Sequence, residues 1–370
     1  MKQNPKITRI EIYKTSIDFV EPFRIAIGEI KRGNGLAVCI HTDSGLIGTG
    51  EGAPYSFITG ETQETCFEVA QVLARILIGK NPLAIEDRIH DMDTFIVHNS
   101  TAKCAFDNAL YDILAKQAGL PLYALLGGEK EVLITDFTIG IGSPEKMTSR
   151  AKEYVQEGAS SIKVKLGTTY HADIERIEAI REAIGWNIAL RIDANQGWDT
   201  FTAIKTLQAL EKFDIDFCEE PVAHWNNAAM KEVHEKSPIA IMADESIFDH
   251  HDAMRLASMR ACTYFNIKLA KAGGINKGLM INAVGESAGI ACMVGGMFET
   301  RVGISAGSHL ISARKNIRFA DLDSTHHYSY DPVIGGVIFE GCKVTLPDDP
   351  GIGAEFDPAF LNDLQKKIIQ

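Results

Sequence analysis

The middle of the chain contains five short apolar segments, and each of them ends in a charged residue. The segments are Ser161–Lys165, Ile188–Asp193, Ile215–Glu219, Ile239–Asp244 and Tyr264–Lys268. The last four end points follow one another at intervals of 26, 25 and 24 residues. One strand, one helix and two loops need about 25 residues. The pattern therefore predicts a repeating β/α unit with a charged side chain at the carboxyl end of each strand.

The N-terminal region alternates between apolar and polar residues, as a half-exposed sheet does. Glycines and charges between Phe23 and Gly35 predict a mobile loop inside the first hairpin, and residues 52–60 predict a second loop. Asp43-Ser-Gly45 is a turn signal. We expect three antiparallel strands, over residues 7–20, 36–42 and 46–51.

From Glu61 the apolar spacing changes to three and four residues, which indicates helices. It predicts helices over 64–78, 82–95 and 100–117, and the third stops at Gly119 before a proline. A sheet followed by helices predicts an α+β module over residues 1–125.

After Leu126-Gly-Gly128 the pattern becomes strand then helix. A strand over 132–139 opens the series, and segments 291–296 and 317–321 supply its last two strands. The series predicts a (β/α)₈, TIM-like barrel over residues 126–330. Little helix can follow the last strand, because Asp331-Pro332 comes soon after it.

Residues 333–347 alternate again, like a pair of strands. We expect the C-terminal tail, about residues 331–370, to return to the N-terminal sheet. The predicted fold is therefore α/β: a modified TIM-like barrel with an α+β capping domain formed by both ends of the chain.

Charge and cysteine content narrow the classes of partner. The formal net charge is −12 and no basic cluster is present, so we expect no nucleic-acid or membrane partner. The seven cysteines are odd in number and contain no CxxC pair, which is typical of reduced thiols in a cytoplasmic protein. We see neither a signal peptide nor an apolar run of about 18 residues that could span a membrane.

In a barrel, the carboxyl ends of all strands face one mouth, so Asp193, Glu219 and Asp244 should converge there. Three carboxylates repel one another unless a cation lies between them. Oxygen ligands favour a hard divalent ion, and Mg²⁺ is the simplest choice. The alternative is three unrelated helix caps, which the regular spacing disfavours.

Lysines are predicted on both sides of this metal. Lys163 and Lys165 share one face of their strand, and Lys268 ends a strand across the barrel. A nearby cation and a second ammonium should lower the pKa of a lysine, which would make it a general base. Salt bridges to the carboxylates are the structural alternative.

A divalent ion beside a base suits removal of the α-proton of a carboxylate. The ion stabilises the enediolate that forms, and bases on opposite faces of the carbon can remove a proton and return it. Enolase-superfamily sites combine a lysine or histidine base with Mg²⁺ in this way.

The motifs Lys163-Val-Lys165, Asp193-Ala-Asn195, Glu219-Glu-Pro221, Asp244-Glu-Ser246 and Lys268 with Gly273-Gly-Ile275 resemble the muconate-lactonizing-enzyme subgroup of the enolase superfamily. The resemblance covers essentially the whole chain. It implies that Lys165 and Lys268 are the opposite bases and that Lys163 assists Lys165. It also implies that Asp193, Glu219 and Asp244 bind one Mg²⁺ per subunit, supported by Asn195 and Glu245.

Within the subgroup, Asp321-Leu-Asp323 resembles the Asp-x-Asp element of dipeptide epimerases, which binds the substrate ammonium. Met297-Phe-Glu-Thr-Arg301 also resembles that family, and its Glu299 and Thr300 would line the mouth. The resemblance implies epimerisation of an Ala-Xaa dipeptide at the C-terminal residue. An exposed acidic pair is the alternative reading of Asp321 and Asp323.

The capping loops should select the second side chain. Arg24 could pair an acidic side chain or the substrate carboxylate, as in Ala-Glu. Apolar residues could instead make a pocket for Ala-Ala or Ala-Val types: Phe19, Phe23, Ile25, Tyr55 and Phe57. The sequence leaves this choice open.

Other functions remain as alternatives. Within the superfamily they are N-acylamino acid racemase, o-succinylbenzoate synthase and muconate cycloisomerase, because one fold hosts many reactions. A non-catalytic scaffold has no reason to keep three acids and three lysines together. A homo-oligomer is expected from the resemblance only.

Overall fold

The computed structural model describes residues 4–370. The N-terminal part is an antiparallel sheet covered by helices. Its strands are β1 (Ile7–Ile25), β2 (Gly28–Thr42) and β3 (Ile47–Gly52), and its helices are α1 (Gln63–Leu77), α2 (Ile85–Phe95) and α3 (Ser100–Ala118). The C-terminal strand β17 (Lys366–Ile369) pairs with β1 and completes the sheet in the order β17-β1-β2-β3. We call this assembly of β1–β3, β17 and α1–α3 the cap.

Eight parallel strands form the barrel, in the order β12-β11-β10-β9-β8-β7-β6-β5. The strands are β5 (Phe137–Ile139), β6 (Ser161–Lys165), β7 (Ala189–Asp193), β8 (Ile215–Glu219), β9 (Ile241–Ala243), β10 (Tyr264–Ile267), β11 (Ala291–Gly295) and β12 (Ile317–Asp321). Hydrogen bonds from Asp136 N to Ala320 O and from Leu322 N to Thr135 Oγ1 join its two ends. The barrel is therefore nearly closed, as predicted.

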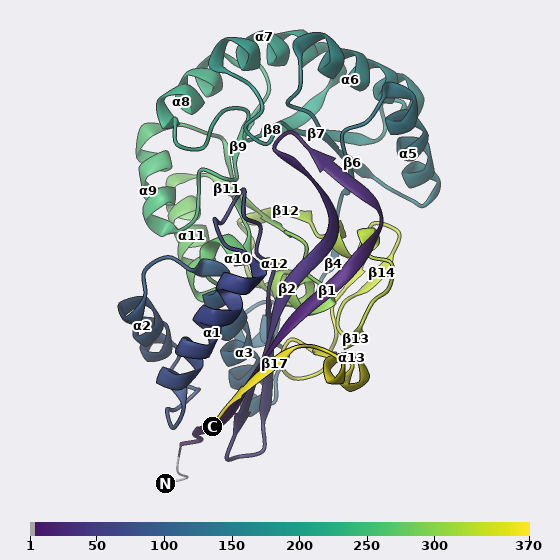
Figure 1. Cartoon of the computed structure of the whole chain (residues 1–370). Coiled ribbons are helices and arrows are strands. Elements are labelled where there is room, and N and C mark those ends of the chain that lie inside the picture. Colours follow the sequence, from purple (N-terminus) through teal and green to yellow (C-terminus); the bar gives the residue numbers. More distant parts are fainter. Residues whose placement is uncertain (1–3) are drawn as a thin grey trace.

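Helices surround the strands, and Figure 1 shows α5 to α9 as an arc outside them. They are α5 (Pro144–Gln156), α6 (Tyr170–Ile184), α7 (Thr200–Leu210), α8 (Asn227–Lys236), α9 (His250–Met259), α11 (Ile275–Ala288) and α12 (Arg301–Ala313). Polar side chains accept a backbone hydrogen bond at the start of six of these helices and so stabilise them. These capping residues are Ser143, Thr169, Asp199, Asn226, Asp249 and Thr300.

Shorter elements fill the connections. They are α4 (Leu122–Leu125), β4 (Val132–Ile134), the 3₁₀ turn Glu211–Phe213, α10 (Leu269–Ala272), the 3₁₀ turn Asp323–His327, β13 (Val333–Gly335), β14 (Ile338–Glu340), β15 (Lys343–Thr345), β16 (Ala354–Phe356) and α13 (Pro358–Asn362). The 3₁₀ turn Asp323–His327 directly follows the last barrel strand in place of a full-length helix, as the sequence indicated. No helix in the described part of the chain is long and apolar enough to cross a membrane.

The predicted loop between Phe23 and Gly35 is wrong. β1 continues to Ile25 and β2 begins at Gly28, so the strands form one long hairpin that crosses the barrel mouth (Figure 1). Phe23 pairs with Ile30 across the hairpin. The segment is therefore part of the sheet although it is rich in glycines and charged residues. Ile141 N also donates to Arg24 O at 2.8 Å, so the hairpin contacts the barrel directly.

Two further expectations need correction. The predicted strand over 132–139 is two strands with different partners: β4 pairs with β15 and β5 pairs with β6, while the buried Asp136 between them pairs with Arg191. Residues 333–347 do not return to the N-terminal sheet; β15 pairs with β4, and β13 pairs with β16. The returning strand is β17.

The cap is joined to the barrel by a buried carboxylate. Glu51 on β3 accepts hydrogen bonds from Thr300 N at 2.9 Å, Thr300 Oγ1 at 2.7 Å and Gly303 N at 2.9 Å. These donors belong to the start of α12, where a negative charge is favourable. One side chain of the cap thus fixes a helix of the barrel.

Replacing Glu51 with alanine should destabilise the protein by roughly 2–4 kcal/mol, because three buried donors lose their acceptor and a cavity is left. Glu68→Ala, an exposed glutamate on α1, is the matched control and should change stability by less than about 0.5 kcal/mol. Thermal unfolding followed by circular dichroism measures both. Equal midpoints for the two variants would contradict the role given to Glu51.

Candidate functional site

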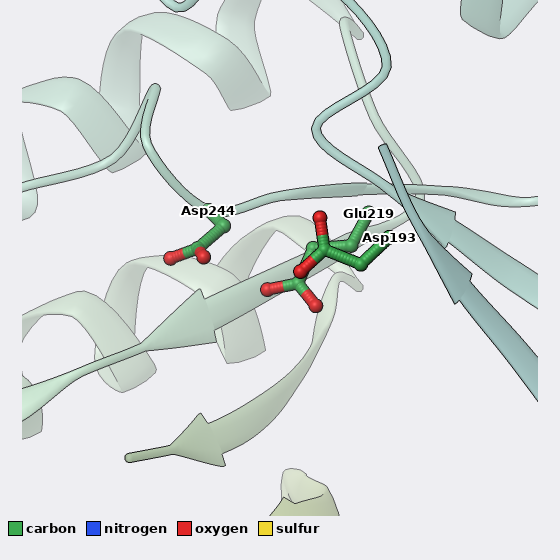
Figure 2. Close-up of side chains that lie close together, drawn as sticks. All are labelled: Asp193, Glu219 and Asp244. Atoms are coloured by element: carbon green, nitrogen blue, oxygen red, sulfur yellow. The ribbon is translucent and has the colours of Figure 1, made fainter. Parts of the chain in front are cut away.

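Three carboxylates lie together at the mouth of the barrel. Asp193 and Glu219 are the last residues of β7 and β8, and Asp244 directly follows β9. All three are fully buried, and one oxygen of each lies within 4.8 Å of the others. Figure 2 shows them at the ends of neighbouring strands. Adjacent parallel strands end at one edge, so equal spacing in the sequence becomes proximity in space.

The surroundings of these carboxylates fit a divalent cation. Within residues 4–370, no hydrogen bond reaches Glu219 Oε2 or either carboxylate oxygen of Asp244, although lysines lie nearby. Burial, together with repulsion from Asp193 and Asp244, raises the pKa of Glu219 to about 8 against the attraction of Lys163. Oxygen ligands without aligned donors are the set that Mg²⁺ takes. Asp193, Glu219 and Asp244 could therefore hold such an ion.

Lysines approach the carboxylates from opposite strands. Lys165 ends β6, whereas Lys268 follows β10, four strands away in a sheet of eight. Lys165 Nζ lies 2.5 Å from Asp193 Oδ2, and Lys268 Nζ lies 2.8 Å from Asp244 Oδ2. Half a turn of the barrel separates β6 from β10, so the two ammonium groups lie on opposite sides of the mouth.

Lys163 lies deeper and is fully buried. Its Nζ is 2.8 Å from Asp321 Oδ2 and 3.3 Å from Asp193 Oδ2, and it also pairs with Glu219. Burial lowers the pKa of Lys163 and of Lys268, but the carboxylates outweigh burial and hold both pKa values above the ordinary range. Acidic side chains contact each ammonium directly, and such contacts favour the charged form of a lysine.

A cavity lies between the lysines and the cap. Charged residues on one part of its lining are Lys165, Lys268, Asp321 and Asp323. The apolar and aromatic residues of the lining are Phe23, Ile25, Tyr55, Ile58, Met297 and Phe298, and the remaining ones are Thr138, Asn195, Gly296, Ser324 and His327. The Tyr55 hydroxyl has no hydrogen-bond partner among the described residues, and burial raises the pKa of Tyr55 to about 12. Such a lining suits a small charged molecule with an apolar side chain.

Asp321 and Asp323 line this cavity at the end of β12, as predicted. Asp321 accepts from Lys163 Nζ at 2.8 Å; burial opposes its ionisation, but Lys163 and Lys268 lower the pKa of Asp321 to about 2. Asp323 accepts from Thr138 N at 2.5 Å, while burial and the nearby Asp321 raise the pKa of Asp323 to about 6. Asp321 is already paired with a lysine, so Asp323 is the freer carboxylate for a bound cation.

Asn195 connects the carboxylates of Asp193 and Glu245. Asn195 N donates to Asp193 Oδ1 at 2.8 Å, and Asn195 Nδ2 donates to Glu245 Oε1 at 3.1 Å. Asn195 has a positive φ of 41°, a conformation that asparagine tolerates better than most residues. The contact holds Asp193 in place, which is the supporting position expected for Asn195.

Arg24 and Phe57 are not brought to the lysines. Phe23 and Ile25 are buried toward the cavity, so the intervening Arg24 lies on the opposite face of β1, exposed. Arg24 lines a second cavity, beside Lys146 and Arg150. The Phe57 side chain is 63% exposed and contacts the edge of the Tyr55 ring.

Glu299 and Thr300 do not line the mouth as we expected. Glu299 is buried and accepts from Met297 N at 2.5 Å, and it faces a separate small cavity. Thr300 is buried, and its hydroxyl donates a hydrogen bond to Glu51. The residues of this loop that line the cavity are instead Met297 and Phe298.

Sequence reasoning missed two buried residues. Lys271 Nζ pairs with Asp244 and donates to Ile247 O at 3.2 Å. The Glu220 carboxylate accepts from Asp244 N at 2.7 Å and Ser246 N at 3.2 Å. Two features of the sequence could have indicated them: a lysine inside the apolar stretch after Lys268, and a second glutamate directly after Glu219. Both residues fix the position of Asp244.

Comparison with known proteins agrees with this geometry. Residues 8–127 match the N-terminal domain of mandelate racemase and muconate lactonizing enzyme, and residues 146–360 match the enolase C-terminal domain-like family. A hydrophobic dipeptide epimerase from Enterococcus faecalis is 44% identical, over 94% of this chain and 99% of its own. An N-succinyl-L-Arg/Lys racemase from Bacillus cereus is 36% identical, over 97% and 98%.

A solved structure extends the comparison to three dimensions. It is a dipeptide epimerase from Cytophaga hutchinsonii complexed with Mg and the dipeptide D-Ala-L-Val, and it superimposes with a TM-score of 0.97. The two chains are 42% identical, and the match covers 99% of this chain and 100% of the other. With both family models matched and relatives similar along nearly its whole length, the chain belongs to the enolase superfamily, in the group of mandelate racemase and muconate lactonizing enzyme.

Proposed function

We propose that this protein epimerises Ala-Xaa dipeptides at the α-carbon of the C-terminal residue by 1,1-proton transfer, with Mg²⁺ as cofactor. The observation that carries the proposal is the placement of Lys165 and Lys268 on opposite sides of one mouth. Relatives named as dipeptide epimerases support it, including one complexed with Mg and a dipeptide.

In this proposal, Asp193, Glu219 and Asp244 hold the metal, and Asn195, Glu220, Glu245 and Lys271 keep the ligands in place. A bound Mg²⁺ would stabilise the charge that spreads over both carboxylate oxygens of the enediolate when the α-proton leaves. Removing the α-proton without such stabilisation is too slow, because this proton is very weakly acidic.

One lysine, as the neutral amine, accepts the α-proton from one face, and the other, as an ammonium, donates a proton to the opposite face. A cation held by Asp193, Glu219 and Asp244 would offset the carboxylate charge that raises the pKa of Lys268, and so would favour its neutral form. The roles of Lys165 and Lys268 exchange when the other epimer reacts. Lys163 keeps its proton because Asp193, Glu219 and Asp321 surround it. It therefore contributes a fixed positive charge beside Lys165 and Asp193.

The substrate ammonium is bound by Asp321 and Asp323. Among residues 4–370, the hydrogen-bond donors to Asp323 are the neutral Thr138 N and Thr138 Oγ1, so a cationic ligand would add a charged partner. N-Acylated substrates lack that positive charge and would leave Asp323 unpaired. The acidic pair therefore favours a free dipeptide over an N-acylamino acid, and epimerisation of dipeptides over the alternative function of N-acylamino acid racemase.

The cavity favours an apolar C-terminal side chain. Phe23, Ile25, Met297 and Phe298 line it, while Arg24 lies on the other face of its strand. An acidic side chain such as glutamate would meet only the His327 imidazole beside Phe23, and burial lowers the pKa of His327 to about 4, which keeps it neutral. The proposal therefore selects Ala-Ala or Ala-Val over Ala-Glu.

Incubation with Mg²⁺ and L-Ala-L-Val in D₂O should place deuterium at the α-carbon of valine, with inversion. Proton NMR follows the loss of the α-proton and the appearance of the second diastereomer. L-Ala-L-Glu should react more slowly, and EDTA should stop both reactions. Turnover of N-succinyl amino acids without any exchange in free dipeptides would contradict the proposal.

Lys165→Ala and Lys268→Ala should each abolish epimerisation while keeping proton exchange in one epimer only, because a single base remains on one face. The two variants should retain exchange in opposite epimers. Incubating each variant with each epimer in D₂O, followed by mass spectrometry, gives the four rates. Exchange of both epimers by either variant would rule out the two-base arrangement.

Asp323→Asn should raise KM for L-Ala-L-Val by roughly tenfold or more, since a charged hydrogen bond to the ammonium is lost. The control substrate is N-acetyl-Ala-Val, which has no ammonium and whose slower exchange should be unaffected. Steady-state kinetics measures both substrates. An unchanged KM for the free dipeptide would remove the ammonium-binding role from Asp323.

A further inference from the structure

The segment that carries Lys268 is held from outside the barrel. Lys268 stands at the beginning of the short helix α10, which leads through Gly273 and Gly274 into α11. Helix α3 of the cap packs against α10. Thr101 Oγ1 on α3 lies 3.5 Å from Ala270 O, within hydrogen-bonding distance. The position of Lys268 thus depends on contacts with the cap as well as on its strand.

A buried carboxylate makes the strongest of these contacts. Asp107 on α3 is fully buried, and its Oδ1 accepts from Ile275 N at 2.5 Å and Asn276 N at 3.4 Å. These are the first two backbone N–H groups of α11, where the helix dipole favours a negative charge. The contact joins the cap to the residues that directly follow the segment of Lys268.

Gly274 allows this approach. Its φ is +117°, a conformation that favours glycine, and a Cβ atom there would lie 2.2 Å from Asp107 Oδ1. A close carboxylate and a glycine without a side chain are therefore matched across the two parts of the molecule. Asp107 is absent from the lining of the cavity, so any effect on the reaction acts through the backbone of α10 and α11.

Among the described residues, no hydrogen bond joins the cap to the segment that carries Lys165, although Ala26 of the hairpin turn lies close to Gly167. Lys165 ends β6 and is paired in the ladder with Asp193 of β7, so the barrel itself fixes its backbone. The two lysines thus differ in their support: hydrogen bonds from α3 hold the segment that follows Lys268, whereas the segment of Lys165 is hydrogen-bonded within the barrel.

We propose that Asp107 is a positioning residue for Lys268: by holding Ile275 N and Asn276 N, it fixes the segment from Lys268 to Asn276 and so places the Lys268 ammonium. This inference rests on the proposed function, because it takes Lys268 as one of two proton-transfer groups. It assigns to the cap a part in proton transfer on one face of the substrate only.

The test isolates each lysine. Asp107→Ala and Asp107→Asn are placed in the Lys165→Ala protein, where only Lys268 can exchange the α-proton, and in the Lys268→Ala protein, where only Lys165 can. The rate measured is deuterium incorporation into L-Ala-L-Val and into its C-terminal epimer. Asp112→Asn is the control, because Asp112 is also buried on α3 but accepts from Thr49 N and Ile352 N, away from Lys268.

Asp107→Ala should slow exchange through Lys268 by up to about 100-fold, since a misplacement of about 1 Å has that effect on a catalytic group. Exchange through Lys165 should change by less than about threefold. Asp107→Asn keeps a weaker, uncharged acceptor. It should therefore lower the ratio of the exchange rate through Lys268 to that through Lys165 in the same direction, by a smaller factor. If the alanine variant does not fold, the asparagine variant decides alone.

The proposal is overturned if the Asp107 variants slow both lysines by the same factor, or slow neither. It is also overturned if Asp112→Asn shifts the ratio as much as Asp107→Asn, because the effect is then a general loss of stability. Should neither single-lysine protein exchange any dipeptide, the proposed function itself fails, and that result is seen before any Asp107 variant is made.

Discussion

Buried carboxylates and buried lysines share the mouth of the barrel, and the rest of the site depends on their mutual attraction. Asp193, Glu219 and Asp244 could not be buried together without compensating charge, because desolvation and repulsion both oppose their ionisation. Lys163 and Lys268 provide part of that charge. A divalent ion would provide the remainder. The same charges make burial tolerable and, in the proposed reaction, would make the α-proton of a bound carboxylate more acidic.

The cap contributes more than a cover. Its hairpin supplies Phe23 and Ile25 to the cavity, and its loop supplies Tyr55. Its buried acids hold the start of barrel helices, Glu51 at α12 and Asp107 at α11. Each of these helices follows a strand whose end lies at the mouth. Burial of an acid at a helix start is favourable because the backbone donors and the dipole replace water. The geometry of the mouth is therefore set jointly by the two parts of the chain.

Much of this site could be predicted from the sequence, because it follows from local periodicity. The spacing of Asp193, Glu219 and Asp244 equals one β/α unit, so a barrel brings them together. Contacts between distant segments could not be read in the same way. The hydrogen bond from Thr300 to Glu51, for example, joins residues that lie far apart in the chain. The composition around Phe23 suggested a loop, whereas pairing with β2 makes it a strand.

The placement of Arg24 has a similar cause. The hairpin contains a register irregularity between Asp18 and Phe23, and such an irregularity decides which side chains face the cavity. Alternation in the sequence cannot locate it, so the sequence could not show whether Arg24 or its apolar neighbours face the cavity. The structure places Phe23 and Ile25 inward and leaves Arg24 outside.

The most direct test of this account is a crystal structure with Mn²⁺ in place of Mg²⁺ and a bound L-Ala-L-Val, with anomalous diffraction to locate the metal. The account predicts one anomalous peak bound by Asp193, Glu219 and Asp244. It also predicts Lys165 and Lys268 on opposite faces of the valine α-carbon. A metal bound elsewhere, or both ammonium groups on the same face, would contradict it.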